Sequence, residues 1–208
     1  TQMSIWPWSD LVSYVMRFSR PQNKSFKVLE LGCGAGANIP FFKHLGIQYY
    51  AMEGSEHIVK ELLHKKFPEF ARNIIVGDFT KEIPFKEQFD LIFDRAAITH
   101  NTTIAIQKTI TYIYERLKPN GKFIGIDWFS TAGSGYQEGV MAEDNFTRNG
   151  YTKGYFAGVG RVHFSDKPHL QELFSSFILD RLEHKLVLQE IPEDKYTLAS
   201  WNFIARKG

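Results

Sequence analysis

The stretch "VLELGCGAGANIPFF", residues 28–42, decides the fold. Its first half is an apolar run typical of a buried β-strand, and glycines follow at every second position as Gly32, Gly34 and Gly36. In an open α/β sheet, the first turn from strand to helix forms part of the ligand site. Because glycine has no side chain, this turn lets a ligand approach the backbone closely. The stretch therefore predicts an α/β fold whose ligand lies against this loop.

Five apolar, strand-like runs alternate with segments of helix length along residues 26–129. The runs are "FKVLELG", "QYYAMEG", "NIIVGDF", "FDLIFDR" and "KFIGIDWF". Between the fourth and fifth runs, isoleucines recur at helical spacing from about Asn101, until Pro119-Asn120-Gly121 ends the predicted helix. This alternation indicates βαβ units around a parallel sheet.

The regular alternation stops after the fifth run. Residues 130–161 are rich in glycine and scattered aromatic residues, and they predict a loop-rich insertion. Ser165 is then expected to cap a short helix. Two alternating runs, residues 178–190 and 195–207, predict an antiparallel pair that closes one edge of the sheet. Residues 1–208 are therefore expected to form a single domain.

The composition is typical of a compact folded protein. Of the 208 residues, 43% are hydrophobic, and the formal net charge of +2 offers no strongly basic surface for nucleic acid. A single cysteine excludes an internal disulfide framework, and no apolar run is long enough for a membrane span. A cytoplasmic protein without a metal site is expected, since the histidines lack metal-ligand spacing. Because the sequence begins with Thr1 rather than Met, residues are expected to precede it.

Acidic residues stand where the first three predicted strands end. Glu30 directly precedes the glycine loop, and Glu53 ends the second strand, where an acid accepts hydrogen bonds from both ribose hydroxyls. Asp78 ends the third strand, where it can accept from an adenine amino group, with Phe79 beside the ring. The glycine spacing G-x-G-x-G differs from the G-x-G-x-x-G of dinucleotide sites, and Glu30 would repel a pyrophosphate. These residues indicate an adenosine-bearing ligand without phosphates; the alternative is that the acids simply face water.

The same motifs resemble those of class I S-adenosylmethionine-dependent methyltransferases. The resemblance rests on "ELGCGAG", "EGS", "GDF", "FDLIFDRAAI" and "LKPNGKFIGIDW" and covers residues 26–129. It implies a Rossmann-like, seven-stranded, mostly parallel sheet with helices on both faces and an antiparallel seventh strand. It also implies S-adenosylmethionine as cofactor and S-adenosylhomocysteine as product. The cofactor-binding residues that follow from it are Glu30, Gly32, Cys33, Gly34, Gly36, Glu53, Gly54, Asp78, Phe79, Asp94 and Arg95.

The residues after the fourth strand bear on the methyl acceptor. Asp94-Arg95-Ala96-Ala97 stands where many DNA and protein-glutamine methyltransferases carry an N/D-P-P-Y/F tetrapeptide. It is similar instead to thiopurine and tellurite methyltransferases, which act on small molecules. "DWFS" and "NIPFF" weakly resemble methyltransferases encoded with bacterial surface-glycan enzymes. The resemblance therefore implies transfer to an oxygen or nitrogen atom of a small molecule, with a sugar or nonulosonic-acid derivative as one candidate. The alternative for Asp94 and Arg95 is a local ion pair.

An oxygen nucleophile also needs a base to remove its proton. The candidates by position are His100, Asp127 and His163, and Arg95 is a candidate to orient an anionic group of the substrate. His100 is expected near the N-terminus of a helix, where the helix dipole disfavours a positive imidazole. The alternative for His100 is a helix cap or a solvated side chain.

Two peripheral segments are candidates to cover the site. The aromatic residues of the insertion, residues 130–161, could close over a substrate, or they could merely pack a long loop. A helix over about residues 5–18, which includes two tryptophans, could lie over the cofactor mouth or only cover the sheet.

Two other functions fit part of the pattern. An NAD-dependent Rossmann oxidoreductase would share the fold class, but the glycine spacing and Glu30 count against it. A catalytically silent subunit that binds S-adenosylmethionine would share the cofactor site. In each case the expected partner is a small molecule rather than nucleic acid or a membrane, and the oligomeric state stays open.

Overall fold

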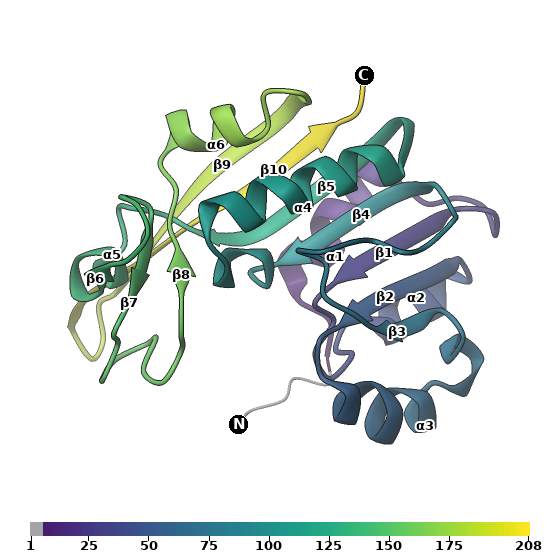
Figure 1. Ribbon diagram of the computed structural model, residues 1–208, viewed down its shortest axis with the longest axis horizontal. Helices are drawn as coiled ribbons and strands as arrows, with labels where there is room; N and C mark the ends of the chain where they lie inside the picture. The colour runs from purple at the N-terminus through teal and green to yellow at the C-terminus, as the bar shows by residue number, and fades with distance from the viewer. Residues whose placement is uncertain (1–5) are drawn as a thin grey trace.

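A seven-stranded sheet forms the centre of the computed structural model, which describes residues 6–208 (Figure 1). The strand order is β3-β2-β1-β4-β5-β10-β9, in which β1 to β5 run parallel and β10 lies antiparallel between β5 and β9. The strands are β1 (Lys27–Leu31), β2 (Gln48–Glu53), β3 (Ile74–Val76), β4 (Phe89–Arg95), β5 (Leu117–Phe129), β9 (Ile178–Gln189) and β10 (Asp194–Arg206). This topology confirms the predicted Rossmann-like sheet and its antiparallel seventh strand.

Helices cover both faces of the sheet and create an apolar core under each layer (Figure 1). One layer contains α4 (Thr103–Arg116) and α6 (Lys167–Leu173). The other contains α1 (Ser9–Tyr14) with its continuation η1 (Val15–Ser19), α2 (Ile39–Leu45), and η2 (Ile58–Leu63), which runs into α3 (His64–Lys66). Because both faces are covered, β1 and β4 are buried over consecutive residues, which explains their continuous apolar runs. Within residues 6–208, no helix has the length and apolar character that a membrane span needs.

Several element boundaries differ from the sequence prediction. α4 gives way to β5 directly at Leu117, so residues 119–121 lie within a strand instead of forming a helix stop. Asp166, rather than Ser165, caps α6, because its carboxylate accepts a hydrogen bond from a backbone N–H three residues further on. The N-terminal helix begins at Ser9, and the residue 5 at which its start was predicted lies outside the described residues.

The predicted insertion contains more regular structure than its sequence indicates. It comprises α5 (Ser134–Glu138), β6 (Val140–Met141) and β7 (Thr147–Asn149), and these strands join β8 (Val162–His163) in an antiparallel sheet of order β6-β7-β8. An apolar cluster that includes Tyr151, Phe156 and Phe164 packs within it. Figure 1 shows this small sheet beyond the end of the main sheet, beside the β9–β10 hairpin. Strands of two or three residues leave no periodic signal, which is why only loops were predicted.

Candidate active site

The loop after β1 is shaped for close approach to its backbone. Gly32, Gly34 and Gly36 have positive φ angles of 72°, 50° and 78°, which glycine adopts without strain. A Cβ atom at Gly32 would lie 2.3 Å from the Cβ of Ala97, so the loop presses against the turn after β4. At Gly34 and Gly54, by contrast, nothing beyond the adjacent residues lies within 4 Å of the Cβ position. The backbone at these two glycines is therefore open on one side, as a ligand held against it requires.

Glu53, at the end of β2, connects that strand with the glycine loop. Its carboxylate accepts hydrogen bonds from the backbone N–H of Gly34 at 2.8 Å and of Ser55 at 3.1 Å. The side chain is half-buried, and a carboxylate has about four acceptor positions. Glu53 therefore keeps acceptor capacity at the open side of the loop, and this geometry fits a ribose diol.

Two expected cofactor residues, Glu30 and Cys33, point into the protein. Glu30 is 3% exposed, and its carboxylate accepts hydrogen bonds from the amide of Asn38 and the hydroxyl of Tyr49. Burial raises the pKa of Glu30 to about 8 and also raises the pKa of the Cys33 thiol. The Oδ1 atom of Asn38 accepts the backbone N–H of Trp8 at 3.3 Å. Glu30 thus fixes the orientation of the Asn38 amide, whose oxygen in turn binds the backbone of Trp8.

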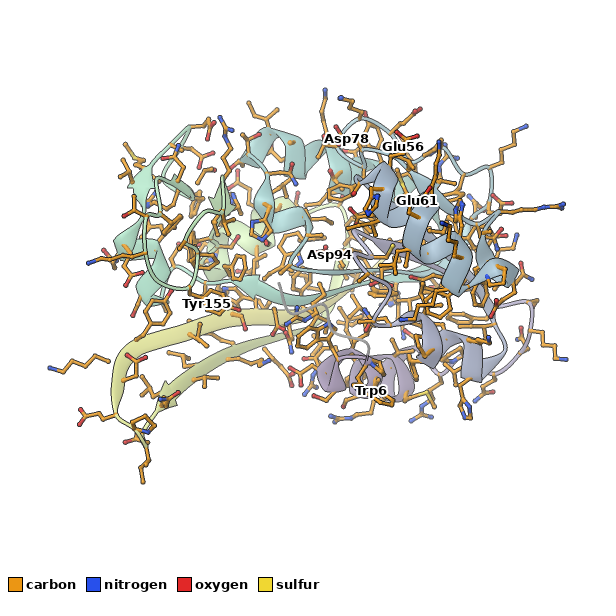
Figure 2. The ribbon with its side chains drawn as sticks, turned by 90° about the horizontal axis from the view of Figure 1, so that it is seen from below. Trp6, Glu56, Glu61, Asp78, Asp94 and Tyr155 are labelled. Atoms are coloured by element: carbon orange, nitrogen blue, oxygen red, sulfur yellow. The ribbon has the colours of Figure 1, made fainter. Side chains whose placement is uncertain are left out.

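Asp78 and Phe79 follow β3 but face in different directions. Asp78 is exposed, as Figure 2 shows at the outer edge of the molecule, and it pairs with Lys81 at 3.3 Å. Hydrogen bonds from Thr80 lower its pKa. The ring of Phe79 turns inward, and its Cε1 atom lies 3.8 Å from the Cβ position of Gly32. Phe79 is therefore the apolar side chain that the fold brings beside the glycine loop.

Asp94, the last but one residue of β4, lies in the interior rather than at the ligand surface (Figure 2). It is 0% exposed. Its Oδ1 atom accepts the backbone N–H groups of Ala97 at 2.8 Å and Ile98 at 3.0 Å, and its Oδ2 atom accepts the indole N–H of Trp128 at 2.8 Å. Burial raises its pKa to about 7, although these donors act in the opposite direction. The alternative of a local ion pair between Asp94 and Arg95 is not seen among the described residues, because Arg95 pairs with Asp127. Asp94 therefore shapes the turn after β4. Its complete burial does not favour direct contact with the cofactor.

A cavity of about 630 Å³ opens next to this turn. Ala96 and Ala97 border it, and Ala97 is the residue that touches the glycine loop. Its apolar wall is formed by Phe129, Phe156, Val159, Phe164, Val187 and Leu198. The lining therefore comes from β4, β5, the insertion and the β9–β10 hairpin. The volume is typical of a site for a small molecule, for which about 300–1,000 Å³ is usual.

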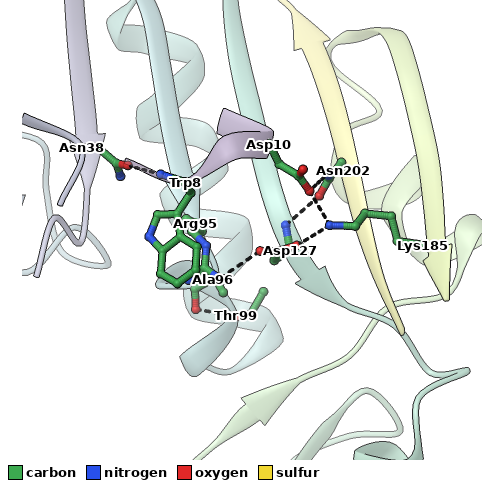
Figure 3. Close-up of polar contacts among 9 residues, drawn as sticks. All are labelled: Trp8, Asp10, Asn38, Arg95, Ala96, Thr99, Asp127, Lys185 and Asn202. Carbon is green, nitrogen blue, oxygen red and sulfur yellow. Dashed lines mark hydrogen bonds and ion pairs between the residues drawn. The ribbon is translucent and has the colours of Figure 1, made fainter. Parts of the chain in front are cut away.

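The floor of the cavity carries an ion-pair network, which Figure 3 shows. Asp127 forms an ion pair with Arg95 at 3.1 Å and accepts a hydrogen bond from Lys185 at 3.0 Å, and Lys185 also pairs with Asp10 of α1. The indole ring of Trp8 covers the Arg95 guanidinium, with 3.4 Å between its Cζ atom and the ring centroid. Asp127 has a left-handed backbone, with φ of 55°. This strained conformation places its carboxylate between two cations at the end of β5.

Of the two candidate histidines, His100 lines the cavity and His163 does not. The Nδ1 atom of His100 lies 3.2 Å from the carbonyl oxygen of Arg161, and desolvation by the surrounding chain lowers the pKa of the imidazole, although its side chain remains exposed. His163 is fully buried, with its Nε2 atom 3.1 Å from Nε2 of His169. Burial and the neighbouring His169 lower the pKa of His163 to about 3. The position of His163 argues against a role as base.

Three residues of the floor network escaped prediction from the sequence. The alternation of residues in β9 predicts that Lys185 faces solvent. Asp10 and Trp8 belong to an N-terminal segment without a motif. Only the tryptophan carried a signal, since an aromatic residue next to a predicted amphipathic helix is a candidate cover for a site. Their joint position depends on contacts between residues 175 apart in the sequence.

Comparison with known proteins assigns this geometry to an enzyme class. A family described as "Methyltransferase domain" matches residues 29–125, which include the glycine loop and β4. Among curated proteins, no match was found. The chain is similar in structure to an S-adenosylmethionine-dependent methyltransferase from Methanosarcina mazei, with a TM-score of 0.72 and 13% sequence identity, over 97% of this chain and 98% of that one.

Two further solved structures have the same fold. One is an S-adenosylmethionine-dependent methyltransferase from Clostridium acetobutylicum (TM-score 0.67, 13% identity, 97% of this chain and 91% of that one). The other is the Burkholderia thailandensis 1,6-didemethyltoxoflavin-N1-methyltransferase, with its substrate and S-adenosylhomocysteine bound (TM-score 0.65, 17% identity, 96% and 77%). A methyltransferase domain over residues 29–125 and the fold shared with S-adenosylmethionine-dependent methyltransferases support the predicted class I methyltransferase and its predicted cofactor.

The role of Asp94 in the turn can be tested by Asp94→Asn. The amide keeps an acceptor for Ala97 and Ile98 but turns an N–H group toward the indole N–H of Trp128. We expect the free energy of unfolding to fall by about 1–3 kcal/mol in chemical denaturation, because a buried donor is left unsatisfied. Asp180→Asn, which breaks a surface ion pair with Arg206, serves as control and should cost less than about 1 kcal/mol. Equal losses in both variants would contradict the role of Asp94.

Proposed function

We propose that this methyltransferase transfers the methyl group of S-adenosylmethionine to an oxygen or nitrogen atom of a small molecule bound in the cavity. The observation that carries this proposal is the shared border at Ala97, which touches Gly32 on one side and lines the cavity on the other. When bound, S-adenosylmethionine supplies an electrophilic methyl group on a sulfonium. The chain's part is to hold the acceptor in line with that group, and such positioning contributes about 7–11 kcal/mol in favourable cases.

The cofactor is held, in this proposal, by the backbone and by one carboxylate. The open backbone at Gly34 and Gly54 receives the ligand, and Glu53 accepts hydrogen bonds from the ribose hydroxyls. Phe79 flanks the adenine ring on the side of the loop, and Asp78 accepts from the adenine amino group at the solvent edge. The other loop residues, including Cys33, shape the turn without contributing side-chain contacts.

His100 acts as the base for an oxygen nucleophile. A carbonyl oxygen only accepts hydrogen bonds, so the contact with Arg161 places the imidazole proton on Nδ1 and leaves the lone pair on Nε2. The lowered pKa keeps this imidazole neutral at neutral pH. Asp127 is the weaker candidate, because both of its carboxylate oxygens are occupied by Arg95 and Lys185. The acceptor hydroxyl thus gives its proton to Nε2 of His100.

The insertion, residues 130–161, covers the acceptor. Phe156 and Val159 belong to it and form part of the cavity wall, so this segment excludes water from the reaction. Arg161 also belongs to it, and therefore the same segment sets the tautomer of His100. An aromatic wall can stack on a planar ring or on the C–H face of a sugar.

The direct experiment is an acceptor screen by mass spectrometry. The purified protein is incubated with S-adenosylmethionine and a panel of small hydroxyl and amino compounds, including sugars and sugar acids. A product heavier by one CH₂ unit, with matching release of S-adenosylhomocysteine, is the expected result. Tight cofactor binding without release of S-adenosylhomocysteine for any acceptor would favour the catalytically silent subunit.

The role of Glu53 is tested by Glu53→Ala. Hydrogen bonds to a charged acceptor contribute about 1.5–3 kcal/mol, so we expect the affinity for S-adenosylhomocysteine in calorimetry to fall about tenfold or more. Glu56→Ala is the matched control, since Glu56 is exposed and pairs with Lys60 one helical turn away. A folded Glu53→Ala variant with the affinity of the control would refute the assignment.

The role of His100 is tested by His100→Gln once an acceptor is known. Turnover should fall by about 10²–10⁴-fold, while the affinity for the cofactor stays unchanged. The pKa of His100 in the folded protein lies below the ordinary 6.5. The wild-type rate should therefore decline only at a pH below 6.5, where the imidazole becomes protonated, and the variant should lack this decline. His44→Gln, at an exposed position in α2, is the control. A loss of less than about threefold would move the role to Asp127 or to an acceptor that needs no base.

A further inference from the structure

The two cations of the cavity floor keep hydrogen-bond donors that bind no other described residue. One carboxylate oxygen of Asp127 pairs with Arg95 and the other with Lys185. Lys185 has three N–H donors, of which two point to Asp10 and Asp127. The Nε atom of Arg95 is buried and has no hydrogen-bond partner among the described residues. The third N–H of Lys185 is therefore left for an acceptor-rich ligand group, with the Arg95 guanidinium beside it in the lining.

The charge of the floor points in the same direction. The cavity is lined by the cations Arg95 and Lys185 and by a single charged acid, Asp127. Asp10, the second partner of Lys185, belongs to α1 and does not line the cavity. With Asp10 counted, two carboxylates balance the two cations, but two of the three charged groups that line the cavity are cations. A negatively charged ligand group is therefore favoured over a positively charged one beside them.

The wall above the floor favours a flat or ring-shaped apolar body. Phe129 meets Phe156 edge to face, with 4.9 Å between ring centroids, and Phe164 packs against both at 5.9 Å and 5.6 Å. Val187 and Leu198 of the β9–β10 hairpin also line the cavity. These side chains offer contact surface and no hydrogen bonds, so this part of the wall suits the apolar body of a ligand.

We propose that the methyl acceptor is a ring compound with a carboxylate group, and that Lys185 and Arg95 bind this carboxylate at the cavity floor. Charge-assisted hydrogen bonds from both cations anchor one end of the molecule, while the ring lies against Phe129 and Phe156. The inference rests on the proposed function, because it takes the cavity to be the acceptor site. The ring can be aromatic or can be the C–H face of a sugar acid, since either fits the wall.

An amine anchored at the floor is disfavoured by the same contacts. An ammonium group would lie beside Arg95 and Lys185, and the only charged acid in the lining already serves both. A neutral hydroxyl or amide would accept more weakly from the two cations than a carboxylate does. The carboxylate is therefore the group that these donors favour.

The experiment measures binding of matched probes to the protein saturated with S-adenosylhomocysteine. The pairs are 4-hydroxybenzoate with 4-hydroxybenzamide, and glucuronate with glucuronamide, so that the aromatic and sugar sources are separated. Calorimetry should show that at least one carboxylate binds about tenfold or more tightly than its amide. In Lys185→Met this preference should shrink to less than about threefold, while Lys185→Arg keeps it because the charge is retained.

Lys153→Met, an exposed lysine of the insertion, is the control and should retain the preference of the wild type. Equal S-adenosylhomocysteine affinity in all variants shows that the fold is intact. Amides that bind as well as carboxylates, absence of binding by both carboxylates, or an undiminished preference in Lys185→Met would overturn the proposal. Methyl transfer to a neutral acceptor would overturn it while leaving the proposed function standing. Carboxylate binding without any transfer would contradict the proposed function instead.

Discussion

A buried carboxylate, that of Asp94, holds together the edge of the sheet on which the site is built. Asp94 accepts three N–H groups, two from the turn after β4 and one from Trp128 at the end of β5. These bonds fix the turn in which Ala96 has a positive φ of 55°. As a result, Ala97 presses on Gly32, and Arg95 is directed to Asp127. The cofactor loop and the cavity floor are thus positioned by the same side chain.

The charges around this edge fall into two zones. The carboxylate of Glu53 lies beside the glycine loop, whereas Glu30 and Asp94 are buried beneath it, where burial raises their pKa values to about 8 and about 7. Cations lie across the turn, where Arg95 and Lys185 line the cavity. A cofactor with a sulfonium and an ammonium group is suited to the acidic zone, and an acceptor with a carboxylate is suited to the cationic one. The border between the zones is Ala96-Ala97, where methyl transfer is proposed.

The fold and the cofactor loop could be predicted because they depend on local sequence patterns. Parallel strands end at one edge, so acids such as Glu53 fall next to the glycine loop by spacing alone. The same pattern cannot distinguish an acid that faces a ligand from one that faces a turn, and Asp94, predicted as a cofactor residue, lies buried against the turn after β4. Lys185 and Asp10 could not be found, since they meet only after α1 and β9 have packed against the sheet. The position of His163 depended on the folding of the insertion, whose short strands leave no signal in the sequence.

The central claim is that the methyl group passes from S-adenosylmethionine, held at the glycine loop, past Ala96-Ala97 to an acceptor in the cavity. A crystal structure of the protein with S-adenosylhomocysteine bound tests it most directly. The ribose hydroxyls should lie within hydrogen-bond distance of the Glu53 carboxylate, and the sulfur should face Ala97 and the cavity beyond it. A sulfur atom directed away from the cavity, or a ribose without contact to Glu53, would contradict the claim.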